Sequence, residues 1–482
     1  MWIYNESDIR NADDTAERNG LSGNTLMELA GRGLFEKIKQ IVPKTNRILI
    51  LSGRGNNGGD GIVLARYLKQ VGYDVELTFP FGESKTDAAK EHFRYYKSLG
   101  YTSANKVDDQ NYDTIVDALL GVGTRLPLNK SFQALLEWCN KQYALRIAID
   151  LPTGVQADCG DVEVAFKAHY TFSLHGFKPA TFLSPSYQYF GKVESIDIGL
   201  PHSSNWRIWT REDVNHSLQR RGRDSHKGTF GTGLLVAGTD EMPGSALLAG
   251  LGAMKIGIGK LIIATSSHAS GIIATKLPEA TFLHGGLQTL TTNSFPSNIK
   301  AMAIGPGLTD RDQIEHLLEK VWGFDIPIIL DAGALYKRTY KIRKAPVLIT
   351  PHPGEFSRLT GYSIKEIQAN RLHLASTYAK ENNLIVVLKG ANTVIAYPDG
   401  TGFINTTGNA ALAKGGSGDT LTGMILGLIC SENDIKSAVN NAVYLHGFCA
   451  DELVRNHNER TIVASDLTSV LGTVLNRLQS QK

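Results

Sequence analysis

Short runs of Val, Ile and Leu recur along the chain, and each is followed by a glycine-containing loop and a helical pattern. These runs do not alternate with polar residues. Strands without such alternation are buried on both faces, as in a parallel sheet covered by helices. This feature constrains the fold more than any other in the 482 residues, and it predicts an α/β fold in both halves of the chain.

Turn signals bound each run and set the limits of the predicted strands. In the first half they are Arg47–Leu51, Val75–Phe79, Thr114–Leu119, Arg146–Asp150, His169–Leu174 and Gly191–Asp197. In the second half they are Gly233–Ala237, Lys260–Ala264, Ala301–Ile304, Ile326–Asp331, Val347–Thr350, Leu384–Lys389 and Val394–Tyr397.

A polar, proline-containing segment, Leu200–Arg211, separates the two series of strands. The chain is longer than a single hydrophobic core usually supports. We therefore expect two domains, residues 1–205 and residues 206–482.

Composition excludes several classes of function. A formal net charge of +3, spread evenly, does not favour nucleic acid or an anionic membrane as a partner. The four cysteines have no metal-type spacing, which indicates thiols in a reducing compartment. Met1–Arg10 lacks the apolar core of a secretory signal, and Leu421–Cys430 is too short to cross a bilayer. We expect a cytoplasmic protein that acts on small molecules.

A glycine-rich loop joins the strand at Arg47–Leu51 to a predicted helix at Ile62–Gln70. Gly53, Gly55 and Gly58 match the pattern G-x-G-x-x-G, which suggests a pyrophosphate at the N-terminus of the helix. Alone, this match is not specific.

Two amides and a carboxylate, Asn56, Asn57 and Asp60, distinguish this loop from a plain dinucleotide loop. A carboxylate would repel a pyrophosphate, so Asp60 needs a cation, a hydrogen-bonding partner or a capping role. The structural alternative is that Asp60 caps the helix.

Two further carboxylates, Asp117 and Asp150, end apolar strands. The carboxyl ends of parallel strands share one edge, so both should converge on the glycine loop. Asn57, Asp117 and the Thr153 hydroxyl would then supply oxygen ligands suited to a hard cation. The alternative is that both are ordinary turn aspartates.

The most specific motif is Gly415-Gly-Ser-Gly-Asp419, which precedes a predicted helix at Asp419–Ile429. Converging backbone N–H groups and the helix N-terminus form an anion hole for a transferring phosphoryl group. Asp419 could accept the proton of the attacking hydroxyl. The alternative is that Asp419 is an N-cap.

Two other loops follow strands of the second half. Lys389 and Gly390, ahead of a hairpin-like turn at Pro398–Gly400, suit the phosphates of an adenine nucleotide. Two prolines fix His352 in a rigid loop, where a structural role is as plausible as a functional one.

The motifs Asn56–Gly61, Asp117–Thr124 and Asp150–Gly154 resemble those of the NAD(P)HX epimerase family, whose members interconvert the epimers of hydrated NADH and NADPH. The resemblance implies a Rossmann-like, three-layer domain. It implies potassium at Asn57, Asp117 and Thr153, where the family usually has Ser. It also implies proton transfer by Asp150. The implied substrate contacts are Asn56, Asn57, Gly58, Gly59, Asp60, Gly121, Val122, Gly123, Thr124, Arg125, Leu126, Pro127 and Asp150. Lys178 matches a lysine-bearing segment of the family without a clear role.

Residues Trp206–Lys482 resemble the ribokinase-like NAD(P)HX dehydratase family, through segments that include Gly305–Leu308, His352–Glu355 and Gly415–Asp419. The resemblance implies phosphorylation of the substrate hydroxyl assisted by Asp419, followed by elimination of phosphate. It implies Mg²⁺ and ADP, with ATP as a possible substitute, and members of both families often form homo-oligomers. The implied substrate contacts are Ala246, Gly307, His352 and Asp419, and the implied nucleotide contacts are Lys389, Gly390, Ala391, Asn392, Thr393 and Gly418.

Two alternatives remain open. A small-molecule kinase, for example of a vitamin alcohol, shares the chemistry of the Gly415–Asp419 motif, but it leaves the first domain unexplained. A non-enzymatic nucleotide-binding module with a decayed site does not explain why Asp60, Asp117, Asp150 and Asp419 are all present.

Overall fold

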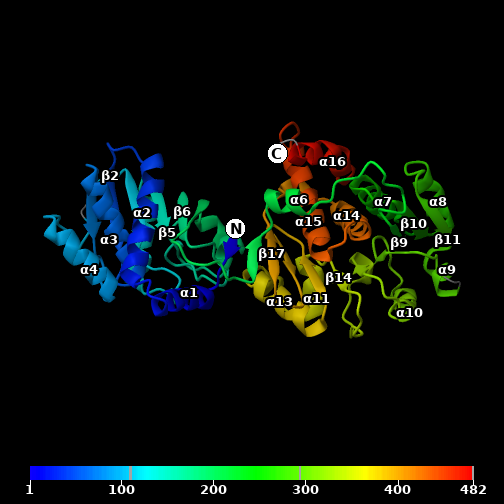
Figure 1. The fold of residues 1–482 in the computed structure, drawn as a ribbon, viewed down its shortest axis with the longest axis horizontal. Helices are drawn as coiled ribbons and strands as arrows, with labels where there is room; N and C mark the ends of the chain where they lie inside the picture. The colour runs from blue at the N-terminus through cyan, green and yellow to red at the C-terminus, as the bar shows by residue number, and fades with distance from the viewer. Residues whose placement is uncertain (108–110, 293–294, 480–482) are drawn as a thin grey trace. The chain divides into compact units, whose positions relative to one another are not determined.

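The computed structural model describes residues 1–107, 111–292 and 295–479. They form two compact units, which we describe separately (Figure 1). Unit 1 comprises Met1–Trp206 and Gln368–Asn370, and unit 2 comprises Arg207–Ile367 and Arg371–Lys482.

Unit 1 is built on a six-stranded, wholly parallel sheet with the strand order β3-β2-β4-β5-β6-β7. Its strands are β2 (Arg47–Ser52), β3 (Asp74–Thr78), β4 (Thr114–Ala118), β5 (Leu145–Ile149), β6 (Tyr170–Leu174) and β7 (Lys192–Ile196), with a short β1 (Trp2–Ile3). Its helices are α1 (Glu6–Arg18), α2 (Gly23–Ile41), α3 (Asn56–Gln70), α4 (Asp87–Ser98) and α5 (Lys130–Lys141), with 3-10 turns at Pro179–Phe182 and Ser186–Tyr189.

Alternation along the strands builds three layers in unit 1. Ile48 and Ile50 of β2 face the core shared with α2, α3 and α4, whereas Leu49 and Leu51 face the core shared with α5. The sheet is therefore covered on both faces, and the prediction of a Rossmann-like, three-layer domain is confirmed.

Unit 2 contains a larger mixed sheet with the order β8-β17-β16-β15-β14-β13-β12-β9-β10-β11. The run from β15 to β11 is parallel, whereas β15, β16 and β17 pair antiparallel. The strands are β8 (Trp206–Ile208), β9 (Thr232–Val236), β10 (Lys260–Thr265), β11 (Thr281–His284), β12 (Ala301–Ile304), β13 (Ile328–Leu330), β14 (Val347–Ile349), β15 (Ile385–Leu388), β16 (Thr393–Ala396) and β17 (Gly402–Asn405).

Helices surround this sheet (Figure 1). They are α6 (Arg211–Ser217), α7 (Pro243–Ile256), α8 (Ser267–Ala274), α9 (Gly286–Thr292), α10 (Arg311–Val321), α11 (Pro353–Thr360), α12 (Ile364–Ala369), α13 (Arg371–Asn382), α14 (Ser417–Ser431), α15 (Ile435–Leu453) and α16 (Ala464–Gln479). Short 3-10 turns lie at Ala332–Ala334 and Ala410–Leu412. No helix in the described residues is both long and apolar enough to span a bilayer.

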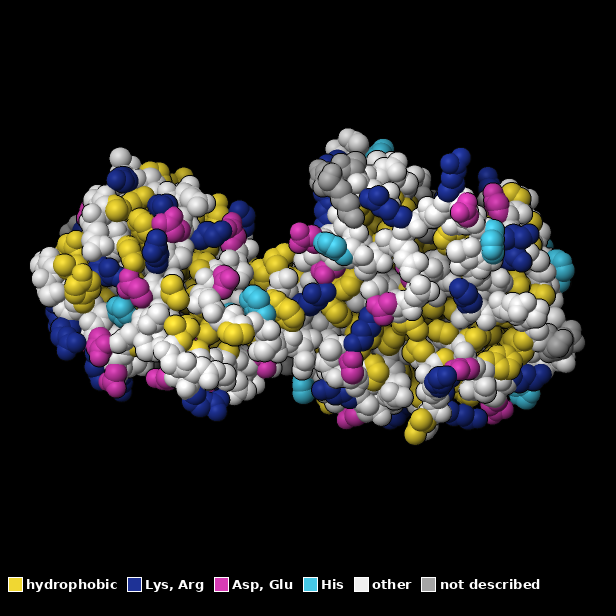
Figure 2. All heavy atoms as spheres, in the orientation of Figure 1, with side chains coloured by type: hydrophobic (Ala, Val, Ile, Leu, Met, Phe, Trp, Pro, Cys, Tyr) yellow, Lys and Arg dark blue, Asp and Glu magenta, His cyan; other side chains and the backbone are white. Residues whose placement is uncertain are grey.

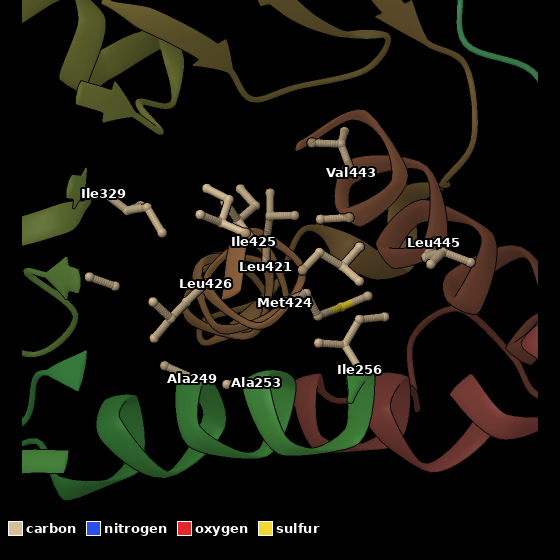
Figure 3. Packing of buried hydrophobic residues seen from close by; sticks show 14 of the residues in the cluster. Ala249, Ala253, Ile256, Ile329, Leu421, Met424, Ile425, Leu426, Val443 and Leu445 are labelled. Carbon is tan, nitrogen blue, oxygen red and sulfur yellow. The ribbon is translucent and has the colours of Figure 1, made fainter. Parts of the chain in front are cut away.

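The core of unit 2 centres on α14, whose residues from Thr420 to Cys430 are all buried. Figure 3 shows Ala249 and Ala253 of α7 pointing toward α14, from which Leu421, Met424 and Ile425 project into the surrounding core. The two helices approach closely because α7 and α14 present small residues to each other. A Cβ on Gly423 would lie 1.8 Å from the carbonyl oxygen of Ala249.

The face of each unit drawn in Figure 2 carries basic and acidic side chains interspersed. This distribution agrees with the even spread of charge inferred from the sequence.

Each predicted strand coincides with an observed strand to within two residues at each end. Strands β1, β8, β11 and β17 were not predicted; β1 and β8 have only two and three residues, too short to show a periodicity. The predicted start of the helix at Ile62 was wrong, because α3 begins at Asn56 and includes part of the expected loop. Likewise α14 begins at Ser417, two residues before the predicted start.

Replacing Gly423 by Val tests the close packing of α7 on α14. Since the new Cβ would overlap a backbone oxygen, we expect a loss of about 3 kcal/mol or more in the free energy of unfolding of unit 2. Gly472 on α16 is the matched control, because a Cβ there meets nothing within 4 Å. Gly472→Ala should instead gain about 0.5–1 kcal/mol. Urea denaturation followed by circular dichroism measures both; an unchanged midpoint for Gly423→Val would contradict this account of the core.

Candidate functional site

A cavity of about 620 Å³ opens in unit 1 at the carboxyl ends of β2, β4 and β5. Strand β2 lies between β3 and β4, so the chain leaves it in one direction and returns on the other side. Ligands of open α/β sheets bind at such a switch point. The predicted residues that line the cavity are Asn56, Asn57, Asp60, Gly121, Val122, Gly123, Thr124 and Asp150.

The glycines of the first motif bring backbones together. A Cβ on Gly53 would lie 1.7 Å from the carbonyl oxygen of Leu119, and a Cβ on Gly58 would lie 2.0 Å from the carbonyl oxygen of Gly53. Gly59 instead lies against the side chain of Met27, on α2. Gly58 and Gly59 do not line the cavity, so their predicted contact with substrate stays a prediction.

Asp60 is buried and does not cap α3, because the N-cap is Gly55 and no side chain caps the helix. Its carboxyl group makes no hydrogen bond or ion pair with any described residue, yet it lines the cavity. Burial raises the pKa of Asp60 well above its usual value, and the neighbouring Asp150 and Asp13 raise it further. A protonated Asp60 is a hydrogen-bond donor, which removes the repulsion that a carboxylate would exert on a phosphate.

Asp117 and Thr153 are hydrogen-bonded to each other, and Leu120 links Thr153 to Asn57, which lines the cavity. The Thr153 hydroxyl donates to Asp117 Oδ1 at 2.8 Å, and the Thr153 N–H donates to Asp117 Oδ2 at 2.7 Å. The pKa of Asp117 is raised to about 6 by burial, against the hydrogen bonds that lower it. Asn57 donates to the Leu120 carbonyl at 2.9 Å, but its own Oδ1 is buried and accepts no hydrogen bond from the described residues. An orphaned acceptor beside a buried carboxyl group fits a monovalent cation.

Asp150 directly follows β5 and is held by Lys178 in a buried ion pair. Lys178 is 1% exposed and also donates to the carbonyls of Leu174 and Gly176, at 2.9 and 3.1 Å. Asp150 has a φ of +69°, a left-handed conformation that costs a non-glycine residue about 1–3 kcal/mol. Strain of this kind persists where the surroundings fix a functional side chain. Lys178, whose role the sequence left open, thus positions Asp150.

The segment Gly121–Pro127 forms the rim next to the cavity. Thr124 closes a turn by donating to the Gly121 carbonyl at 2.8 Å, and Arg125 forms an exposed ion pair with Glu6 of α1 at 2.8 Å. Arg125, Leu126 and Pro127 do not line the cavity itself.

Among the lining residues that sequence reasoning missed, Arg10, Asp13 and His175 carry polar or titratable groups. Burial lowers the pKa of His175 to about 4, so its ring is neutral. Both of its ring nitrogens are buried without a hydrogen-bonding partner in the described residues, and its φ is +64°. The positive φ of His175 cannot be recognised from the sequence. Arg10 and Asp13 were missed because α1 shows no motif that indicates a ligand.

In unit 2 the carboxyl edge of the sheet gathers the second set of residues around another switch point, where β9 lies between β10 and β12. The Gly238 N–H donates to the Pro306 carbonyl at 2.8 Å, which joins the loops that follow β9 and β12. A Cβ on Gly307 would lie 2.9 Å from Ser245 Cβ, and a Cβ on Gly238 would lie 2.8 Å from Ala246 Cβ. Gly307 and Ala246 are therefore brought together, as expected.

Asp419 lies in the first turn of α14, whose N-cap is Gly416 with a φ of +90°. The alternative that Asp419 is the N-cap is therefore wrong. Its carboxyl group is hydrogen-bonded to the Ser245 side chain. Burial raises the pKa of Asp419 to about 6, so that it is mostly ionised at neutral pH and able to accept a proton.

Lys389 connects the carboxyl groups of this edge. Its ammonium group lies 3.0 Å from Asp331 Oδ1 and 4.0 Å from Glu355 Oε2, and it lies against Gly418. Burial lowers the pKa of Lys389, but Asp331 and Glu355 outweigh this effect and raise it. Thr422 donates to the other oxygen of Asp331 at 2.7 Å. Asp331, Glu355 and Ser245 had not been predicted as site residues.

His352 has the structural role that we had left open. It is the N-cap of α11, where its Nδ1 accepts from the N–H groups of Gly354 and Glu355 at 3.0 and 3.3 Å. Its Nε2 lies 3.5 Å from Glu355 Oε1. The side chain is half exposed, so capping leaves one face of the ring free to meet a ligand.

The proposed nucleotide loop, residues 389–393, connects the antiparallel strands β15 and β16. Gly390 lies over the buried guanidinium group of Arg371, where a Cβ would be 2.5 Å from Nη1. Asn392 adopts a φ of +57°, and the Thr393 hydroxyl donates to the Gly390 carbonyl at 3.1 Å. The loop is thus held at both ends, and Ala391 forms its middle.

Comparison with solved structures identifies the fold of unit 2. Unit 2 has the fold of a ribokinase-like superfamily protein from Enterococcus faecalis, with a TM-score of 0.50 at 23% identity over 58% of this chain and 99% of the other. It is more similar to a solved structure of the ADP/ATP-dependent NAD(P)H-hydrate dehydratase from Bacillus subtilis, co-crystallised with ATP and Mg²⁺. That match has a TM-score of 0.56 and 49% identity, and it covers 57% of this chain and all of the other. The prediction of a ribokinase-like α/β fold is confirmed.

Family models match both units: residues 23–180 match the YjeF-related protein N-terminus, and residues 233–472 match NAD(P)H-hydrate dehydratase. A bifunctional NAD(P)H-hydrate repair enzyme from Moorella thermoacetica is 32% identical over 95% of this chain and 93% of its own length. The chain belongs to the family of bifunctional NAD(P)H-hydrate repair enzymes.

Replacing Lys178 by Met tests its positioning of Asp150. Removing one partner of a buried ion pair leaves an uncompensated charge, so we expect unit 1 to lose about 3–5 kcal/mol. The double variant Lys178→Met/Asp150→Asn should recover much of this loss. Hydrogen–deuterium exchange of peptides from β5 and β6 reports on unit 1 alone.

Lys37→Met is the matched control, because Lys37 pairs with Glu194 at 2.8 Å on the partly exposed surface of the same unit. Its cost should be under about 1 kcal/mol. Equal costs for Lys178→Met and Lys37→Met would contradict the assigned role of Lys178.

Proposed function

We propose that the protein repairs hydrated NADH and NADPH in two steps, with residues 1–205 as an epimerase and residues 206–482 as a nucleotide-dependent dehydratase. The observation that carries this proposal is the match to bifunctional relatives along nearly the whole chain, together with a candidate acid–base residue in each unit, Asp150 and Asp419. The vitamin-kinase alternative is disfavoured, since it gives no task to the cavity of unit 1.

In unit 2, Asp419 is suited to accept the proton of the substrate's C6 hydroxyl as the hydroxyl oxygen attacks the terminal phosphoryl group of the nucleotide. Ser245 orients the carboxylate, and backbone N–H groups of Gly415–Gly418 at the start of α14 would stabilise negative charge on the phosphoryl oxygens. Phosphate then leaves from C6 and C5 loses a proton, which restores the dihydropyridine. Phosphate leaves more readily than hydroxide, which explains why a nucleotide is consumed.

Adenine nucleotide would bind at Lys389–Thr393 and Gly418, next to the substrate residues Ala246, Gly307 and His352. The relative from Bacillus subtilis was co-crystallised with ATP and Mg²⁺, which supports a magnesium nucleotide here. We propose ADP as the phosphoryl donor, giving AMP and phosphate, with ATP as a substitute. Mg²⁺ neutralises phosphate charge when it is bound.

In unit 1, loss of the C6 hydroxyl gives a planar cation that water can attack from either face, and opening of the ring gives a planar aldehyde carbon that N1 can attack from either face. Asp150, fixed by Lys178, lies where it can transfer a proton at C6. Acid–base transfer by a positioned carboxyl group contributes roughly 10²–10⁴-fold. Asn56–Asp60 and Gly121–Pro127 would hold the dinucleotide around it.

We further propose that the protein acts in the cytoplasm on small molecules only, and that it forms a homo-oligomer. The even spread of charge and the absence of a membrane-spanning helix from the described residues support the first statement.

The direct test follows recovery of reduced-nicotinamide absorbance from a mixture of both NADHX epimers, with ADP, ATP or no nucleotide, in the presence of Mg²⁺ and K⁺. We expect complete recovery with ADP, because a dehydratase alone stalls when its own epimer is exhausted. Asp419→Ala should abolish recovery while epimers still interconvert, and Asp150→Ala should give partial recovery only. No recovery with either nucleotide would overturn the proposal and favour a kinase.

Potassium at Asn57, Asp117 and Thr153 can be tested without an activity assay. A ligand that binds only the folded state adds about 2.7 kcal/mol of stability at a hundredfold excess over Kd. We expect KCl to raise the melting temperature relative to choline chloride, and Asp117→Asn to lose this increment. Asp161→Asn, at an exposed position of the same unit, should retain it. An equal increment in all three proteins would rule out a cation site at Asp117.

A further inference from the structure

Helix α1 forms one wall of the unit 1 cavity, although its sequence carries no recognisable motif. The lining residues Ile9, Arg10, Asp13, Asp14 and Glu17 recur at the spacing of one helical face. An Asn5 capping box fixes the start of the helix, and the ion pair of Glu6 with Arg125, at 2.8 Å, joins the helix to the rim. The wall is therefore anchored next to the segment expected to bind the dinucleotide.

Asp13 is a carboxyl group of this wall that interacts electrostatically with Asp150 and Lys178. It is half-buried, it lines the same cavity as Asp150 and Lys178, and it forms no hydrogen bond or ion pair with any described residue. A half-buried carboxyl group without a partner is costly unless a ligand engages it. The carboxyl group of Asp13 can therefore bind a ligand. The ammonium group of Lys178, in contrast, already donates to Asp150 and to three other oxygens.

Electrostatic coupling joins Asp13 to Asp150. Burial and the charge of Asp150 together raise the pKa of Asp13 to about 6, against the opposing charge of Lys178. The charged and titratable groups around Asp13 are Arg10, Asp14, Asp60, Asp150 and Lys178. Two interacting carboxyl groups lose their protons in steps that belong to the pair, so we expect one shared proton below about pH 6.

Resting on the proposed function, we propose that Asp13 is a second acid–base residue of epimerisation and works with Asp150 as a pair that shares one proton. The two carboxyl groups come from different elements, α1 and the end of β5, which allows each to serve a different part of the same cavity. Lys178 forms its ion pair with Asp150 and not with Asp13, so in this proposal Asp13 carries the proton at the start.

The chemistry balances with these two groups and water. Protonated Asp13 gives its proton to the C6 hydroxyl, the C6–O bond breaks with its electron pair on oxygen, and water leaves. The N1 lone pair forms the N1–C6 double bond. A water oxygen then bonds to C6 from the other face, the double-bond pair returns to N1, and the water's proton goes to Asp150. Passage of that proton from Asp150 to Asp13 restores the enzyme, and the opposite epimer uses the same steps in reverse.

The decisive variant is Asp13→Asn, which keeps the shape of the side chain and removes its proton transfer. We expect the kcat of epimerisation to fall by about 10²-fold, with KM changed by less than about 3-fold, because the amide still fills the cavity wall. The kcat of the wild type should also decline as pH rises above about 6, where the shared proton is lost, and Asp13→Asn should lack this decline.

Asp8→Asn is the matched control. Asp8 is likewise a half-buried aspartate of α1, but it does not line the cavity and its carboxyl group serves the capping box. If Asp13 merely stabilised α1, both variants would lower the rate and the melting temperature together. Dehydration of purified S-NADHX by the same full-length chain serves as an internal measure of folded enzyme.

The outcomes are distinct. A wild type that does not interconvert the epimers overturns the proposed function and this inference with it. A wild type that does, with Asp13→Asn of unchanged kcat and pH profile, overturns the role of Asp13 alone. A rise in KM with kcat unchanged would make Asp13 a binding residue and would likewise overturn its role in proton transfer.

Discussion

Close approach of backbone to backbone at the carboxyl edge of each sheet is the constraint on which both sites depend. Gly53 lets the loop after β2 touch the Leu119 carbonyl after β4, and Gly305 does the same for the Asp331 carbonyl after β13, where a Cβ would lie 1.7 Å from the oxygen. Any side chain at these two positions would force the strand ends apart. Because the loops are in contact, carboxyl groups that are far apart in sequence are buried close together in each unit.

That burial explains the behaviour of the carboxyl groups. Burial raises the pKa values of Asp60, Asp117 and Asp419, but the three carboxyl groups differ in their hydrogen-bonding partners. Asp117 accepts hydrogen bonds from Thr153, and Asp419 is hydrogen-bonded to Ser245. The carboxyl group of Asp60 faces the cavity and has no such partner among the described residues. Asp150 differs from all of them, since a lysine neutralises it directly. The chemistry expected of each group follows from its partner rather than from its residue type.

Much of this arrangement could be predicted from the sequence, and the reasons for the rest are physical. The non-alternating strands fixed which ends share an edge, so Asp117, Asp150 and the Asn56–Asp60 segment were correctly expected to converge. The early start of α3 was missed because glycine and asparagine have low helix propensity, and tertiary packing overrides it. Asp13 was missed because nothing local to α1 shows that one of its faces closes a cavity.

The two units lie on one polypeptide, which has a consequence for how the repair pathway can be controlled. Every copy of the first catalyst is synthesised with one copy of the second, so their ratio is fixed at one to one at translation. A cell cannot adjust the balance between the two steps through expression. Only a substitution or a bound ligand that affects one unit can change it, which makes the relative turnover of the two centres an inherited property of the chain.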